Sequence, residues 1–319
     1  MTNKRVFYAT QAVLLDTAGT ALGASDVIKG VQPVGINTTI DHRTIRDLGN
    51  PSPISILEGK PQVEASVERI IASVNDVIFP SSGGDLLADA THAKEYDMLL
   101  LVGEEAREQI DTSGASTQAE LKLSYLQVSS VSYNFEVNGP FTESISFVGH
   151  NKEWSTTRTF SSTGQLGFTH SGDVARRSDY NTSSSVMPSE VEGTIQGVSI
   201  SFSLDRREVL DLGKRQGVSS VSDSNKYKLL NIPVEIQTDI TTVVKEKDFS
   251  GDITAQSFTN APASKQLKIV LTIGGSNLTF DMGSENYLND VSRSGGEAGG
   301  GGNVESTYSY VNYNSFSIS

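Results

Sequence analysis

The stretch Val34-Gly35-Ile36-Asn37-Thr38-Thr39-Ile40-Asp41-His42-Arg43-Thr44-Ile45-Arg46-Asp47-Leu48-Gly49 has a second copy, Val198-Ser199-Ile200-Ser201-Phe202-Ser203-Leu204-Asp205-Arg206-Arg207-Glu208-Val209-Leu210-Asp211-Leu212-Gly213. In both copies an alternating run of residues reaches Asp-x-Arg and ends in an aliphatic residue followed by Asp-Leu-Gly. Alternation with a period of two is typical of a β-strand that buries one face. Each copy therefore predicts a strand that enters an Asp-x-Arg turn and then a structured loop. The two copies share four positions, which are Asp41, Arg43, Asp47 and Gly49 in the first copy and Asp205, Arg207, Asp211 and Gly213 in the second.

The repeat extends beyond this motif and indicates a duplicated chain. The motif has a constant offset of 164 residues (205 − 41 and 213 − 49), and residues 63–67 resemble residues 234–238 at an offset of 171 (234 − 63). Solenoid repeats run to only ~20–50 residues, whereas 319 residues are enough for two ordinary domains. We therefore predict a first β domain over 1–153, a Ser/Thr/Gly-rich connection over 154–190 and a second β domain over 191–319.

Period-two alternation dominates the rest of the chain. Two alternating runs, 131–137 and 140–147, flank Asn138-Gly139, which is the strongest short signal for a β-hairpin. A second hairpin is expected where 267–273 and 278–282 flank a glycine-containing turn at 274–277. The sequence thus predicts a mainly β fold.

Helical patterns are scarce. Residues 103–110 begin with acidic side chains, as the helix dipole favours, and are the best helix candidate. Residues 69–77 are ambiguous between strand and helix. We expect one short helix in each half.

Composition excludes several classes of protein. The formal net charge of −13 argues against a nucleic-acid-binding face, because phosphate neutralisation needs clustered Lys and Arg. The chain has no cysteine, which excludes disulfides, thiolate zinc sites and thiol catalysis. Thr10 and Gln11 interrupt the apolar run at the N-terminus, so we expect a first β-strand there, not a secretory signal. No stretch approaches the ~20 apolar residues of a membrane span.

An aspartic protease is the most concrete enzymatic hypothesis. Asp16-Thr17 and Asp111-Thr112 offer two carboxylates that could share a proton. A protease loop needs glycine directly after Asp-Thr or Asp-Ser, and Ala18 and Ser113 stand there instead. Turn-capping aspartates are therefore the better interpretation.

Other chemistry has even less support. Gly197-Val198-Ser199-Ile200-Ser201 lacks the second glycine of a nucleophile elbow. The four histidines, His42, His92, His150 and His170, show no metal-ligand spacing. We expect no enzyme activity, no cofactor and no metal. Function should instead come from surfaces, and two similar domains can occupy equivalent positions in a ring of copies.

Three parts of the chain together resemble bacteriophage tail tube proteins. They are the segment 131–154, the two Asp-x-Arg…Asp-Leu-Gly segments, and the closing Tyr308-Ser309-Tyr310-Val311-Asn312-Tyr313-Asn314-Ser315-Phe316. The resemblance covers most of both halves, apart from the connection and the glycine-rich stretch near residue 300. These motifs are structural, and their joint order carries the resemblance.

The resemblance implies tandem tail-tube-like β-barrel or β-sandwich domains, each with a short flanking helix. It implies stacked rings that form the channel for genome ejection, in a virion tail that is synthesised and assembled in the host bacterial cytoplasm. The duplication favours rings of three copies, as in long non-contractile tails, over rings of six. The implied partners are further copies of the chain, a tape measure protein, and tail terminator and baseplate proteins. DNA would pass through the lumen without specific binding, and no membrane partner is implied.

Another β-rich virion component is the alternative: a tail terminator, a baseplate tube component or a capsid decoration protein. Open-ended polymerisation separates these alternatives, because a terminator or an initiator should stop at one ring. An acidic lumen would repel DNA phosphates within roughly a Debye length, ~8–10 Å. The sequence does not assign the acidic residues that face such a lumen.

Overall fold

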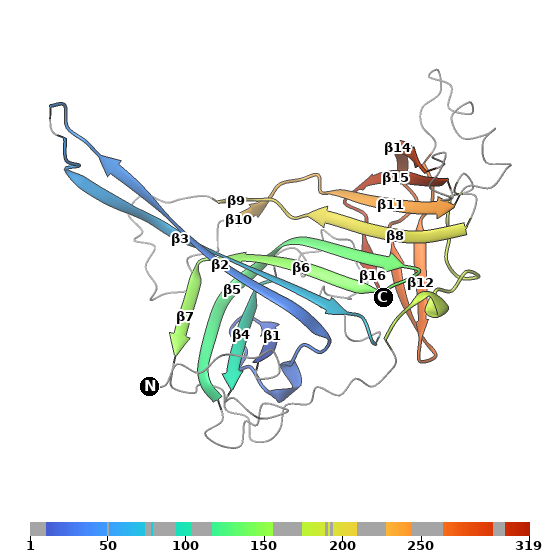
Figure 1. Ribbon diagram of the computed structural model, residues 1–319, viewed down its shortest axis with the longest axis horizontal. Helices are drawn as coiled ribbons and strands as arrows, with labels where there is room; N and C mark the ends of the chain where they lie inside the picture. Colours follow the sequence, from blue (N-terminus) through green and yellow to red (C-terminus); the bar gives the residue numbers. More distant parts are fainter. Residues whose placement is uncertain are drawn as a thin grey trace.

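The computed structural model describes residues 11–49, 51–73, 78, 94–103, 117–155, 174–188, 191, 194–208, 228–243, 264–295 and 304–319. Within these ranges the protein is mainly β, as predicted, and its strands form antiparallel sheets (Figure 1). The strands of the first half are β1 (Gln11–Thr17), β2 (Val31–Ile45), β3 (Ser55–Ile70), β4 (Tyr96–Gly103), β5 (Thr117–Glu136), β6 (Thr142–Gly149) and β7 (Asn151–Ser155). The strands of the second half are β8 (Thr194–Ser203), β9 (Arg206–Glu208), β10 (Lys228–Leu230), β11 (Glu235–Val243), β12 (Lys268–Ile273), β13 (Ser276–Asp281), β14 (Tyr287–Ser294), β15 (Glu305–Tyr313) and β16 (Ser317–Ile318).

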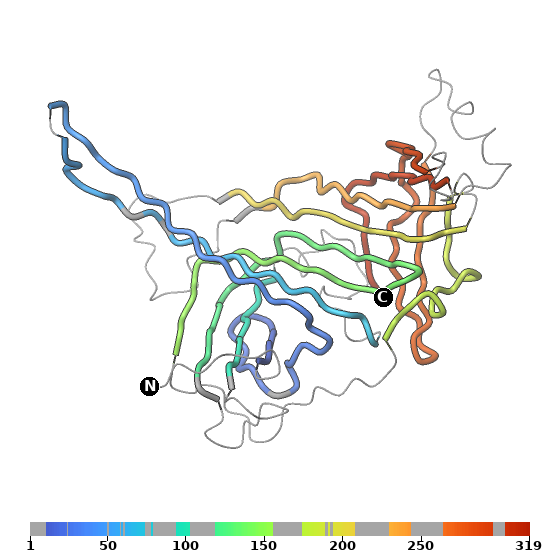
Figure 2. The backbone as a smooth tube through the Cα atoms, in the orientation of Figure 1, coloured from blue at the N-terminus to red at the C-terminus, as the bar shows by residue number. Residues whose placement is uncertain are grey.

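One large open sheet runs through both halves. Its strand order is β14-β15-β11-β8-β5-β6-β3-β2, with β1, β4 and β7 attached through β5. Strands β12, β13 and β16 form a separate three-stranded sheet, and β9 pairs with β10. The long β2–β3 hairpin leaves the body as an arm, at the upper left of Figure 2.

Strand β5 serves two parts of the large sheet because it bends. Its first part pairs with β4 and β7, and its second part pairs with β6 and β8. At the bend, Tyr125 adopts a φ of 57°, a conformation that is uncommon for a residue with a side chain. The buried carboxylate of Asp97 accepts the backbone N–H of Tyr125 at 3.0 Å and that of Gly19 at 3.3 Å. Asp97 therefore fixes the corner of β5 against the end of β1.

The larger of two apolar clusters among the described residues connects the two halves. Alternate residues of the large sheet point into it, and the β12–β13–β16 sheet covers it. Aromatic rings join the halves directly: Tyr133 lies 4.9 Å from Phe280 and 6.0 Å from Phe316, between ring centroids. Offset or tilted aromatic pairs of this kind add about 0.5–1.5 kcal/mol each beyond the area that they bury.

Several elements predicted from the sequence are confirmed. The β5–β6 hairpin turns at 137–139, and β1 occupies the predicted first strand from Gln11 onward. The second hairpin is β12–β13, with its turn confined to Gly274 and Gly275 at φ values of 59° and 86°. Two successive positive φ values match the twist of the flanking strands, which is why glycine stands at both positions.

The predicted Asp-x-Arg turn is wrong in both copies. Asp41 lies at a register shift inside β2, and the strand continues to Ile45 before the chain reverses. Asp205 stands at a short break between β8 and β9, after which the strand direction resumes. A bulge bends a strand without ending it. Across from this bulge, a Cβ added to Gly59 would lie 3.0 Å from the Asp41 carbonyl oxygen, so glycine allows the close approach.

The helix candidates lie largely outside the described residues. In the candidate 103–110, Gly103 ends β4, and 104–116 lie outside the described residues. In the ambiguous segment 69–77, Arg69 and Ile70 end β3, and 74–77 lie outside the described residues. The helical elements among the described residues are two 3-10 turns, η2 (Ala24–Asp26) and η4 (Arg177–Asp179). The flanking helices therefore stay a prediction.

The strand order of the large sheet repeats. The first-half strands β2, β3, β6 and β5 are neighbours in that order, and the second-half strands β8, β11, β15 and β14 are neighbours in the same way. We call each set a quartet. Both quartets contain a register shift at the same place, between Val128 and Ser130 in β5 and between Leu288 and Asp290 in β14. A shared bulge is strong evidence that β14 is the equivalent of β5.

The hydrogen-bond register refines the sequence repeat. Thr38 pairs with Val63, and Phe202, its equivalent at the offset of 164, pairs with Ile236. The offset from β3 to β11 is therefore 173 (236 − 63), two residues more than the 171 predicted from the sequence. A shift of two keeps every side chain on the same face, so the sequence pattern could not detect it.

Equivalent positions hold different chemistry in the two halves. Arg69 pairs with Glu143 across β3 and β6, and both are buried with Nε and Oε2 3.7 Å apart. At the same place in the second half Thr242 pairs with Ser306, also buried. Glu143 also accepts hydrogen bonds from the Tyr133 hydroxyl and from the backbone N–H of residue 78, each at 2.9 Å. Burial and the nearby carboxylate raise the pKa of Tyr133, which keeps its phenol protonated as the donor.

Replacing Glu143 by Ser alone should destabilise the protein by about 3–5 kcal/mol, because it leaves a buried guanidinium without its carboxylate. The double variant Arg69→Thr/Glu143→Ser copies the second half and should lose clearly less than the sum of the two single changes. Urea unfolding of all four proteins measures this cycle. Additive losses would show that the two side chains are not coupled.

Candidate assembly surface

The two quartets join side by side through β5 and β8. The register pairs Val131 with Phe202 and Tyr133 with Ile200, and all four residues are buried. At one end of the junction, Leu204 donates its backbone N–H to the Ser129 carbonyl at 2.7 Å. This junction connects the last strand of one quartet to the first strand of the other.

The outer strands of the large sheet each have one neighbour among the described strands. These strands are β2, which pairs with β3, and β14, which pairs with β15. They lie at opposite ends of the sheet (Figure 1). An unpaired strand edge is a template for pairing with another chain.

The repeat makes these two edges complementary. Strand β2 is the equivalent of β8 and β14 is the equivalent of β5, and β8 and β5 already pair inside the chain. The β14 edge of one copy therefore has the same pattern of donors and acceptors as the strand that β8 meets. An edge that fits a different edge on an identical chain defines a head-to-tail contact, which closes into a ring or continues as a filament.

Side chains along β2 show the same relation. Ile40 is 48% exposed, whereas its equivalent Leu204 is 1% exposed in the junction between the quartets. Val34 and Ile36 are only partly buried, whereas their equivalents Val198 and Ile200 are buried. Apolar residues that are buried at the internal junction thus stand partly uncovered at the free edge.

The face of the large sheet opposite the core, which we call the open face, has a distinctive composition. It is formed by the residues of the two quartets that alternate with the core-facing ones, and on β3 it begins at Gln62. None of these described positions carries Lys or Arg. Its charges come from seven acidic residues, Glu64, Glu68, Glu136, Glu235, Asp239, Asp290 and Glu305, and most other positions are Ser, Thr, Asn, Gln or Gly.

Neutral amides hold several of these acids. Gln62 donates to Glu64 at 3.0 Å, and Asn134 donates to Glu136 at 2.8 Å. The amide of Gln237 reaches both carboxylate oxygens of Asp239, at 3.1 and 3.0 Å. The hydrogen-bond donors to these carboxylates are thus uncharged amides.

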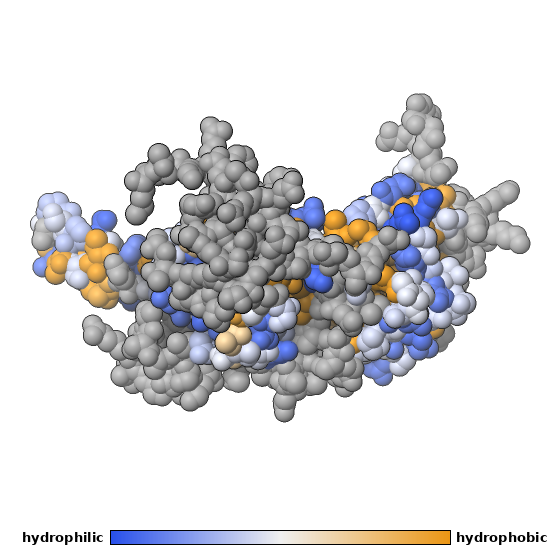
Figure 3. Space-filling model, turned by 90° about the horizontal axis from the view of Figure 1, so that it is seen from below, coloured by the Kyte–Doolittle hydropathy of each residue, from blue (hydrophilic) through white to orange (hydrophobic). Residues whose placement is uncertain are grey.

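The β2–β3 arm exposes apolar residues toward its tip. Its cross-strand pairs place Ile56 opposite Thr44 on one face, and Leu57 opposite Arg43 on the other. Figure 3 shows apolar residues at the left end of the molecule, where the arm projects. The large exposed apolar residues of the arm are Ile40, Ile45, Leu48, Ile54, Ile56 and Leu57. An isolated two-stranded hairpin is marginally stable in water, and this one exposes apolar side chains on both faces.

The structure does not gather the repeated motif into one site. Asp41 and Arg43 lie exposed in the arm, and Asp47 and Gly49 form its tip, where Asp47 accepts the Leu48 N–H at 2.9 Å. Gly49 has a φ of 86°, which explains the glycine. In the second copy Asp205 and Arg207 are exposed beside the internal junction, and Asp211 and Gly213 lie outside the described residues.

Other elements of the repeat were not found from the sequence. Before each quartet, a Ser-Asp pair forms a 3-10 turn, with Asp26 accepting the Gly23 N–H at 2.6 Å and Asp179 accepting the Arg176 N–H at 3.0 Å. The turns are too short and too common in composition to stand out in the chain. Beyond η4, Tyr180 and Val186 bridge to β12, so this part of the predicted connection packs against the second half. Ala175, before η4, instead exchanges backbone hydrogen bonds with Ile71 and Phe141 of the first half.

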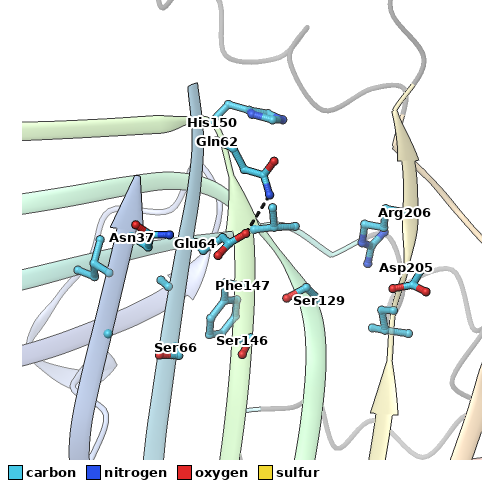
Figure 4. Close-up of a pocket in the computed structure, with 15 residues that line it drawn as sticks. Asn37, Gln62, Glu64, Ser66, Ser129, Ser146, Phe147, His150, Asp205 and Arg206 are labelled. Carbon is cyan, nitrogen blue, oxygen red and sulfur yellow. Dashed lines mark hydrogen bonds between the residues drawn. The ribbon is translucent and has the colours of Figure 1, made fainter. Parts of the chain in front are cut away.

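A cavity of about 700 Å³ opens where β5 bends away from β8 (Figure 4). Residues of β2, β3 and β6 line it on one side, and Asp205 and Arg206 line it on the other. Burial lowers the pKa of Arg206, and Glu95 partly offsets this effect. The His150 Nδ1 lies 2.9 Å from the Pro61 carbonyl oxygen. A carbonyl oxygen only accepts hydrogen bonds, so this nitrogen is the donor. The lining of the cavity therefore includes hydrogen-bonded polar residues.

The protease pair is not assembled by the described residues. Asp16 lies in β1 and accepts the Thr17 N–H at 2.6 Å, whereas Asp111 lies outside them. In the described part of the chain, no group of three or more His, Asp or Glu side chains could hold a metal ion. That part also contains no helix of the length and hydropathy needed to cross a membrane.

No protein-family model matches the chain, and no curated protein matches it.

Proline at residue 291 should block the free edge of β14 without unfolding the protein. The Leu204–Ser129 hydrogen bond sets the alternation of the internal junction, so the equivalent residues 291 and 293 point their N–H groups away from β15. Proline is tolerated at an edge when the missing N–H faces solvent. Val291→Pro should remain folded by circular dichroism and lose self-association in light scattering. Val291→Ala, which keeps the N–H, should still associate; equal loss in both would contradict edge pairing.

Proposed function

We propose that the protein is the structural subunit of a bacteriophage tail tube, which assembles through its sheet edges into stacked rings. The observation that carries this proposal is the pair of complementary free edges, β2 and β14, on a duplicated quartet. The internal β5–β8 junction is the template for the contact between copies. Main-chain pairing of this kind gives affinity along the whole strand.

Three copies would give six quartets around an axis, since each chain contributes two (3 × 2). The internal junction also gives the register between copies. Ser132 faces Ser201 inside the chain, and the equivalent pair would be Ser292 of one copy and Asn37 of the next. A ring of six chains is the alternative stoichiometry, and a helical filament would result if the rotation did not close.

The open face would line the channel. The other face of the large sheet is covered by the core and the β12–β13–β16 sheet, so the open face is the one left for a lumen. Its seven acids and hydroxyl-rich positions offer DNA phosphates no cationic partner. Repulsion acts within roughly a Debye length, ~8–10 Å, and keeps a duplex from adhering to the wall.

The arm is suited to contacts between rings. Its apolar residues lie beyond the sheet edge that would form a ring, and burying them against copies in the adjacent ring would stabilise stacking. The two-domain barrel or sandwich architecture, the flanking helices and the tape measure, terminator and baseplate partners follow from the resemblance and belong to the same proposal. A terminator, a baseplate tube component or a capsid decoration protein remains the alternative function, and enzymatic activity is not part of either.

A designed disulfide tests the proposed register. The natural chain has no cysteine, so a cross-link can form only between introduced thiols. In the variant Asn37→Cys/Ser292→Cys, oxidation should link copies into species that disappear on reduction in gel electrophoresis. The two single variants are the controls and should remain monomeric. Efficient linking in either single variant, or none in the double variant, would contradict this register.

Negative-stain electron microscopy tests the function itself. Purified protein should form tubes with a central channel, and end-on averages should show threefold symmetry with six similar lobes. Single rings that never extend would favour the terminator or baseplate alternatives. Uniform globules at high concentration would contradict the tube proposal.

A further inference from the structure

Trp154 is an unusual residue for an edge strand. It is the chain's only tryptophan, and it is 56% exposed on β7. Large aromatic side chains carry much of the binding energy of protein interfaces, often at a few central positions. The repeat allows its environment in an assembly to be inferred from the second half.

The equivalent of Trp154 is Ile318. Trp154 pairs with Leu121 of β5, and Ile318 pairs with Phe280 of β13. Leu121 and Phe280 are both core residues. Leu121 lies on β5, which pairs with β4, and Phe280 lies on β13, which pairs with β12 in the same way. The offset is 164 residues (318 − 154).

A second contact supports this equivalence. Lys152 donates to Thr38 at 3.0 Å, which places β7 beside β2. At the offset of 164 these residues correspond to Phe316 and Phe202, and their rings lie 5.0 Å apart. Strand β7 therefore stands to the free edge of β2 as β16 stands to β8.

In the second half this place is buried. Ile318 is 1% exposed, whereas Trp154 is 56% exposed. The rings of Phe316, just before β16, and of Phe280, in β13, pack against the first half, since both contact Tyr133 of β5. The β12–β13–β16 sheet of the second half thus covers β5, the last strand of the quartet that joins β8.

We infer that Trp154 is an interface residue, which a second copy of the chain buries when its β14 pairs with β2. This inference rests on the proposed edge-joined assembly and names a contact within it. The core-facing residues that β14 brings to the contact are Val291 and Arg293, the equivalents of Val131 and Tyr133. A guanidinium can stack on the face of an aromatic ring, and the indole of tryptophan attracts it more strongly than the rings of Tyr or Phe.

The single tryptophan makes the contact directly measurable. On assembly, followed by light scattering over a concentration series, the fluorescence emission of Trp154 should shift to shorter wavelength and become less accessible to acrylamide. In Val291→Pro the emission should keep the position of the dilute wild type at every concentration. Assembly without a shift would overturn the buried contact and leave the proposed function standing. Absence of assembly in the wild type would overturn the proposed function and this contact together.

Substitution gives an independent readout. Trp154→Ala should weaken association by about 30-fold or more, the effect typical of an aromatic interface anchor. Trp154→Phe should recover part of the loss, since it restores an apolar ring. The matched control is Val174→Ala, which truncates another exposed apolar residue and should leave association unchanged. Unchanged association in a folded Trp154→Ala variant, with circular dichroism like the wild type, would overturn the inference.

Discussion

The pairing of β5 with β8 is the constraint on which the rest of the structure depends. It joins two quartets into one sheet, and it places Tyr133 of the first half under Phe280 and Phe316 of the second. Strand β5 can make this contact only because it bends at Tyr125, where Asp97 holds the backbone. The junction also determines what remains outside it, since the strands equivalent to β5 and β8 become the two outer edges.

The halves have diverged where they meet different neighbours. Tyr133 lies against aromatic rings inside the chain, whereas its equivalent on the outer edge is Arg293. Leu204 is buried, whereas its equivalent Ile40 stands half exposed. The internal junction is therefore more apolar than the outer edges of the sheet.

The sequence predicted those elements whose signals are local. The β5–β6 and β12–β13 hairpins follow from alternating runs that flank Asn-Gly or Gly-Gly. In the second hairpin both glycines adopt positive φ values. The Asp-x-Arg segments were predicted as turns, although the first lies at a bulge in β2 and the second at a short break between β8 and β9, because all these features use the same small polar residues. The register of β11 was missed by two residues, since a shift of two leaves the pattern of buried faces unchanged. The complementary edges depend on which strands become neighbours, and no local pattern encodes that.

The bulge that recurs at Ser129 and Asn289 has a geometric consequence. A bulge bends its strand and increases the local twist, and this bulge lies at the same level of the equivalent strand in each quartet. The radius of a closed sheet would then be a property of the quartet and not of the chain. Chains with one quartet and chains with two could then form rings of the same circumference. Duplication would halve the number of subunits in the ring without changing the diameter of its channel.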